Sequence, residues 1–229
     1  MVEIADIFST IGTILSFILS FTPLFPFIKV FKKEEKIDIL PEGLLLFLIL
    51  NRLGWGSVWI LTKRKIALLN SVLGTFVCNI FVFLYFYLYF NRKICAKAFF
   101  SSVLLLVLEG GILYLAVWWG DYLSLSYIAM VFNVMMFISP GQKIIRVIKE
   151  KNYKLIPIFS AIINILVSSA WLGYGICINL FAQIVPNALG LFFSLVNTSL
   201  WIYFYCKTGK EKDKKDENEG EDEIELIEK

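Results

Sequence analysis

The chain has 229 residues, of which 58% are hydrophobic and 16% aromatic, and its mean hydropathy is +0.73. This composition leaves too little polar surface for a soluble globule, so we expect an integral membrane protein surrounded by the lipid bilayer. There is no histidine, and Cys78, Cys95, Cys177 and Cys206 show no paired spacing. A zinc site, a histidine-based triad and a disulfide framework therefore lack their components, so we expect no enzyme, metal, cofactor or nucleic-acid partner.

Seven apolar stretches are each about 20 residues long, which is the length a helix needs to cross a hydrocarbon core about 30 Å thick. They lie near residues 7–28, 41–61, 66–90, 98–118, 122–142, 155–178 and 181–206. The first stretch lacks the basic start and the small-residue cleavage site of a signal peptide, so we interpret it as a retained helix. The predicted fold class is an all-α membrane protein with seven transmembrane helices.

Basic residues in short loops predict the orientation, because such residues are enriched on the cytoplasmic side of membrane proteins. They follow the first, third and fifth predicted helices and recur in the C-terminal tail, whereas the segment TKRK at 62–65 is an exception on the opposite side. We therefore expect an extracellular or luminal N-terminus and a cytoplasmic C-terminus. The charge-rich residues 207–229 are predicted to be a disordered cytoplasmic tail.

The sequence contains an internal repeat. Trp55 follows Pro41 by fourteen residues, and Trp171 follows Pro157 by the same distance, an offset of 116. At this offset Gly74 matches Gly190 and Ser71 matches Asn187, while Pro23 matches Pro140 at 117. We predict two parallel three-helix units, at residues 5–92 and 121–206, joined by a connector helix at 93–120 that lets both units keep the same orientation.

The four repeat-matched prolines are candidates for hinges or gates near the cytoplasmic side. Pro23 and Pro140 lie inside apolar runs, where a proline kinks a helix and a neighbour or an aqueous cavity must satisfy the freed carbonyl. Pro41 and Pro157 lie at predicted helix starts, so these two either act as hinges or simply begin their helices.

These motifs resemble the SWEET family of sugar transporters. The segments that carry the resemblance are TPLFPFIKVFKKEEKIDILP in the first repeat and the Ser139-Pro140 pair, SAWLGYG and IVPNALG in the second. The resemblance covers most of residues 5–206. It implies two triple-helix bundles, a mid-membrane sugar site between them, facilitated bidirectional diffusion by alternating access without ion coupling, and homo-oligomers.

Five residues are candidates for binding a small neutral sugar. Asn187 offers an amide for ring hydroxyls, and Trp171 offers an aromatic face for the apolar side of the ring; Trp55 is its counterpart in the first repeat. The family's first repeat typically has an amide where Ser71 stands, and Asn70 is one residue earlier. Because one residue rotates a helical side chain by about 100°, either Ser71 or Asn70 faces the pocket.

Two charged residues, Arg52 and Glu109, lie in apolar stretches, where charges are functional candidates. They form a pair, or Arg52 either snorkels or lines the cavity while Glu109 on the connector tunes packing. A Glu109 that faces the pathway would instead bind a proton. That last alternative fits a proton-coupled transporter of the related PQ-loop class, although neither hinge proline, Pro23 or Pro140, is followed by Gln. A seven-helix trafficking receptor is the second alternative.

The end of the tail contains an acidic dileucine pattern, in which Asp222 precedes Leu226 and Ile227. Clathrin adaptors bind this pattern on cytoplasmic tails, and chance also produces it in acidic segments. The sequence is therefore compatible with two locations. One is an endosomal or vacuolar membrane, which the protein reaches through an adaptor, and the other is the plasma membrane.

Overall fold

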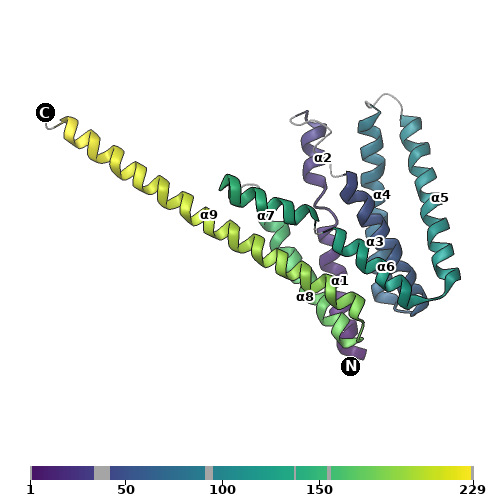
Figure 1. The fold of residues 1–229 in the computed structure, drawn as a ribbon. Coiled ribbons are helices and arrows are strands. Elements are labelled where there is room, and N and C mark those ends of the chain that lie inside the picture. Colours follow the sequence, from purple (N-terminus) through teal and green to yellow (C-terminus); the bar gives the residue numbers. More distant parts are fainter. Residues whose placement is uncertain (1, 34–41, 91–94, 137, 154–155, 228–229) are drawn as a thin grey trace.

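The computed structural model describes residues 2–33, 42–90, 95–136, 138–153 and 156–227, and its regular structure in these ranges is helical throughout. In chain order the helices are α1 (Val2–Leu19), α2 (Leu24–Phe31), α3 (Glu42–Leu61), α4 (Lys65–Tyr89), α5 (Cys95–Trp119), α6 (Tyr122–Met135), α7 (Ile138–Glu150), α8 (Ile158–Cys177) and α9 (Phe181–Ile227). Figure 1 shows them as a bundle with α5 at one edge beside α4. The all-α prediction is confirmed.

Five segments of the described chain are long and apolar enough to cross a membrane. They are Glu3–Phe31, Lys65–Tyr89, Phe99–Trp119, Ile158–Cys177 and Phe181–Lys207. Two shorter apolar segments, Phe47–Leu61 and Tyr122–Met135, lie where the sequence predicts the second and fifth crossings. The outer surfaces of these helices are rich in exposed Ile, Leu, Val and Phe, as expected for helices that face lipid.

The first predicted crossing is interrupted by a turn between α1 and α2. Pro23 lacks the N–H that would continue the helical ladder, and the backbone there tightens to i→i+3 bonds, such as Phe21 N to Ile18 O at 3.2 Å. The hydroxyl groups of Ser20 and Thr22 donate to the carbonyls of Ser16 and Leu19, which stabilises the turn. The apolar pattern alone could not reveal this interruption.

Two other hinge candidates, Pro140 and Pro157, lie at helix starts. The predicted fifth crossing, 122–142, ends as helix α6 at Met135, and Pro140 lies in the first turn of α7, where a missing N–H costs little. Pro157 is the residue that precedes α8 and forms its N-cap. Pro41 lies outside the described residues.

The helices of the two halves of the chain pack against each other. Helix α1 contacts α4 and α8, and α3 contacts α4, α5 and α6, while α9 contacts α6, α7 and α8. The largest buried apolar cluster draws on both halves: Ala5, Trp55, Val58, Trp59, Ala67, Leu125, Ala129, Val167, Trp171, Tyr174 and Ala182. The core of the protein therefore lies between its N-terminal and C-terminal helices.

The C-terminal segment, residues 207–229, is predicted from the sequence to be disordered. Helix α9 continues without interruption from the bundle to Ile227, and Figure 1 shows it projecting well beyond the other helices.

Candidate functional site

An aromatic cluster joins α3 to α8. The Trp55 and Trp59 rings stack at 5.1 Å with an interplanar angle of 17°. Trp59 meets Tyr174 edge to face at 5.7 Å, and Tyr174 meets Trp171 in the same way at 5.5 Å. All four side chains are buried. The structure therefore brings Trp55 and Trp171, two of the predicted site residues, into one cluster.

Helix α1 contacts Trp171 and holds its side chain in place. Its indole N–H donates a 2.9 Å hydrogen bond to the hydroxyl oxygen of Ser16. One turn earlier, Gly12 leaves room for the indole, since a Cβ built there would lie 2.9 Å from the Cε2 atom of Trp171. Trp171 is thus fixed in orientation, as a binding surface for a sugar ring requires.

Asn187 lies at the same height in the bundle as Trp171. Helices α8 and α9 are joined by a short turn and run antiparallel, and a Cβ built on Gly175 would lie 3.1 Å from the Cγ of Gln183. Trp171 precedes Gly175 by four residues and Asn187 follows Gln183 by four, so both are one turn from this contact. Asn187 is 8% exposed, and its amide N–H donates to the Gln183 carbonyl at 2.6 Å.

In the first half of the chain, the side chains of Ser71 and Asn70 lie in different surroundings. A Cβ built on Gly56 of α3 would lie 3.6 Å from the Cβ of Ser71, so Ser71 faces α3 at about the height of Trp55. Ser71 is 3% exposed, and its hydroxyl has no hydrogen-bond partner. The side chain of Asn70 is half-buried, and its backbone carbonyl accepts from Arg52.

The side chain of Arg52 on α3 lies against α4 and reaches Ser20, the residue after α1. Its guanidinium packs on Gly74, where a Cβ would lie only 2.5 Å from the Cζ atom, so a larger residue could not replace this glycine without moving Arg52. Two long hydrogen bonds of 3.4 Å reach the Asn70 carbonyl and the Ser20 hydroxyl, and the Nε atom is buried without a partner.

Glu109 pairs with Asn79 and not with Arg52. The amide of Asn79 on α4 donates to the Glu109 carboxylate on α5 at 2.9 Å and to the Thr75 carbonyl at 3.0 Å. The other carboxylate oxygen of Glu109 is buried without a partner. This bond fastens α5 to α4.

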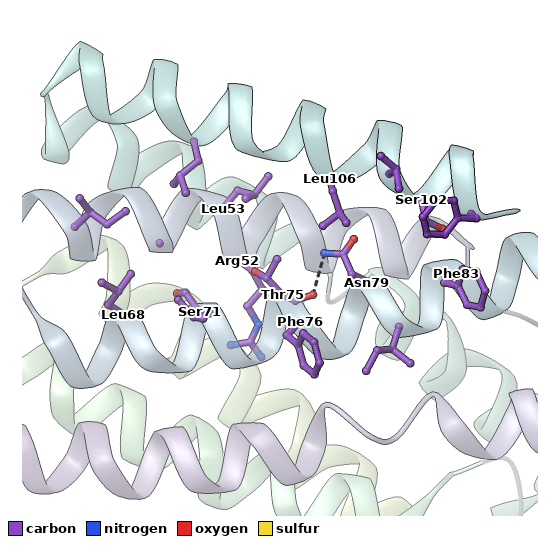
Figure 2. A pocket seen from close by; sticks show the side chains of 17 residues that line it. Arg52, Leu53, Leu68, Ser71, Thr75, Phe76, Asn79, Phe83, Ser102 and Leu106 are labelled. Atoms are coloured by element: carbon purple, nitrogen blue, oxygen red, sulfur yellow. Dashed lines mark hydrogen bonds between the residues drawn. The ribbon is translucent and has the colours of Figure 1, made fainter. Parts of the chain in front are cut away.

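A cavity of about 680 Å³ lies between α3, α4 and α5 (Figure 2). Arg52, Ser71, Thr75 and Asn79 give it a few polar groups, and the remaining lining is almost entirely apolar. Such a lining suits a hydrocarbon better than a sugar ring, so this cavity is distinct in chemistry from the Trp171–Asn187 region.

Sequence reasoning did not find three residues of this arrangement. Trp59 carries a weak signal, since it follows Trp55 by four residues and so shares its helix face. Ser16 and Asn79 carry no signal in the sequence, because their partners, Trp171 and Glu109, are 155 and 30 residues away in the chain.

Comparisons with known proteins agree with this architecture. The sequence profile of the family described as "Sugar efflux transporter for intercellular exchange" matches residues 123–209. The bidirectional sugar transporter SWEET10 of Arabidopsis thaliana is 24% identical over 90% of this chain and 72% of its own length. The sugar transporter SWEET1 of Caenorhabditis elegans is 29% identical over 64% of this chain and 50% of its own length.

A solved structure of a eukaryotic SWEET transporter shares the fold, with a TM-score of 0.74 and 20% identity over 88% of this chain and 97% of that one. The apolar helices, the Trp171 and Asn187 motifs, the sequence relatives and this structure agree: over most of its length the chain is similar to SWEET transporters, and residues 123–209 match the family profile.

Proposed function

We propose that the protein is a membrane carrier of small neutral sugars, which it moves in both directions by facilitated diffusion. The observation that carries the proposal is that the buried side chains of Trp171 and Asn187 lie at one height in the α8–α9 pair, and that Trp171 belongs to the cluster that joins the two halves. Curated relatives with the names of sugar transporters support the substrate class.

We propose that the helices form two triple-helix bundles with α5 as the connector. The first bundle is α1 with α2, α3 and α4, and the second is α6 with α7, α8 and α9. Support comes from two close contacts: Gly12 of α1 against Trp171 of α8, and Ala129 of α6 against Gly54 of α3. Ala129 is the repeat counterpart of Gly12 at an offset of 117 residues, and Trp171 is the counterpart of Trp55, the neighbour of Gly54, at an offset of 116. The two contacts therefore join corresponding helices of the two repeats.

In the proposed site the amide of Asn187 bonds sugar hydroxyls, and the indoles of Trp171 and Trp55 pack on the apolar face of the ring. To bind, the Asn187 amide exchanges its bond to the Gln183 carbonyl for one to the substrate. The first bundle contributes the hydroxyl group of Ser71 to this site, because the side chain of Ser71 is buried whereas that of Asn70 is only half-buried. Alternating access follows from rocking of the two bundles about this site, with Pro23, Pro41, Pro140 and Pro157 as the hinge positions.

We propose an extracellular or luminal N-terminus and a cytoplasmic C-terminus. Figure 1 shows the ends of α2 and α4 and the start of α5 at one end of the bundle, and the start of α1 with the α3–α4 and α5–α6 connections at the other. The first end carries Lys29, Lys32 and Lys33. The resident membrane is proposed to be endosomal or vacuolar, through adaptor binding to the tail, and homo-oligomers are expected from the family resemblance.

The test is uptake of labelled glucose and sucrose in cells that lack their own sugar carriers, with and without an imposed pH gradient. The proposal predicts saturable flux that follows the sugar gradient and is unchanged by the pH gradient. Flux that is driven by protons would indicate the PQ-loop class of mechanism, and the absence of flux at normal expression would indicate a trafficking receptor.

A further inference from the structure

The cavity between α3, α4 and α5 opens toward the surroundings of the bundle through an apolar entrance. Its rim is formed by side chains that are exposed on the outer faces of α4 and α5: Val72, Phe76, Ile80, Phe99, Val103 and Leu106. In a membrane this surface faces acyl chains, so an occupant would enter from the lipid phase. The volume, about 680 Å³, is within the range of ordinary ligand sites.

The wall opposite this entrance carries polar groups that lack partners. Ser71 is 3% exposed with an unbonded hydroxyl, and the Nε of Arg52 and the amide oxygen of Asn79 are also buried without partners. Figure 2 shows Ser71, Thr75 and Asn79 following one another along α4 beside Arg52. Buried polar groups of this kind are costly unless a ligand satisfies them.

The charge of Arg52 is the strongest indication of the ligand. Among the described residues no carboxylate lies within 4.0 Å of its guanidinium, and the ion pair that does occur joins Arg146 to Glu150. The nearby Glu109 is bonded to Asn79 instead. A cation within a membrane helix normally has a partner, so the cavity is complementary to an anionic head group.

We propose that this cavity binds a long-chain fatty acid, whose carboxylate pairs with Arg52. The lining runs along α4 from Leu68 to Phe83, fifteen residues or about 22 Å of helix. This exceeds half of a hydrocarbon core of about 30 Å, which is the depth that one acyl chain spans. Ser71 lies toward the Leu68 end, and Arg52 packs on Gly74 in the same half of this lining, so the acyl chain extends past Asn79 toward Phe83 and Phe99.

Binding is measured on the purified full-length protein with oleic acid and, as an uncharged analogue, oleyl alcohol. The wild type is expected to bind oleate saturably and at least tenfold more tightly than the alcohol. Arg52→Gln removes this preference, while Arg146→Gln, which changes an exposed arginine, keeps it. Equal affinity for acid and alcohol in the wild type, or an unchanged preference in Arg52→Gln, would overturn the proposal.

A second measurement locates the site without altering Arg52. A fatty acid with a diazirine near its methyl end is photo-crosslinked to the wild type, and labelled peptides are identified by mass spectrometry. Labels on the α4 and α5 segments around Phe83 and Phe99 are expected, and Leu106→Trp, which fills the cavity, should abolish them. Labels spread evenly over lipid-facing helices, or unaffected by Leu106→Trp, contradict a defined site.

Discussion

The indole N–H of Trp171 on α8 donates a 2.9 Å hydrogen bond to the hydroxyl of Ser16 on α1, and both residues are buried. This bond connects the N-terminal half of the chain to the helix that carries the best-supported aromatic residue of the site. A buried indole N–H without an acceptor is unfavourable, so Ser16 controls both the stability and the orientation of Trp171.

Ser16→Ala is therefore expected to lower the free energy of unfolding by about 1–3 kcal/mol and to weaken sugar transport. The measurement is thermal stability of the detergent-solubilised protein together with uptake. Thr10→Ala is the control, because Thr10 is exposed and its hydroxyl donates only to the Asp6 carbonyl of its own helix. If both variants behave alike, the bond to Trp171 has no special role.

Gly12→Ala tests the close approach of α1 and α8. The new methyl group would lie 2.9 Å from the Cε2 atom of Trp171, so the helices must separate or the indole must rotate. Overpacking of this kind typically costs about 1–3 kcal/mol. Gly110→Ala is the matched control, since nothing lies within 4 Å of its Cβ position. A melting temperature that falls for Gly12→Ala and not for Gly110→Ala is expected, and equal melting temperatures would refute the contact.

The Asn79–Glu109 bond predicts a coupling between α4 and α5. Asn79→Leu should destabilise the protein by about 1–3 kcal/mol, because the Glu109 carboxylate loses its donor. The double variant with Glu109→Leu should recover part of this loss, since both polar groups are then replaced. Thermal unfolding of the four proteins in this cycle measures the coupling, and strictly additive effects would show that the bond contributes nothing.

The positions of the apolar helices could be predicted from the sequence because lipid imposes a minimum apolar length on each crossing. The common height of Trp171 and Asn187 was also accessible, since both lie in a recognisable repeat. The turn before Pro23 could not be predicted, because it depends on which carbonyl groups accept hydrogen bonds from the Ser20 and Thr22 hydroxyls. The Asn79–Glu109 bond could not be predicted either, because the rotation of each helix about its axis decides which side chains meet across a packed interface.

The acidic dileucine pattern of the tail predicts adaptor-dependent sorting. Leu226 and Ile227 lie in the last turn of α9, which must unwind if an adaptor binds the pattern in an extended form. Helix ends unwind at little cost, so the helical tail does not exclude this. A tagged protein with Leu226→Ala and Ile227→Ala is expected to move from endosomal or vacuolar membranes to the cell surface. An unchanged distribution would mean that the pattern is inert.

The most direct test of the account is counterflow of labelled glucose and sucrose into proteoliposomes that contain only the purified protein, with the wild type beside Asn187→Ala. The wild type is expected to exchange at least one of these sugars without a pH gradient. Asn187→Ala should fold normally, as judged by its elution profile and melting temperature, and lose exchange because bound hydroxyls lack the amide. Ordinary exchange by a folded Asn187→Ala protein would contradict the assigned site, and no exchange of either sugar by the wild type would contradict the proposed function.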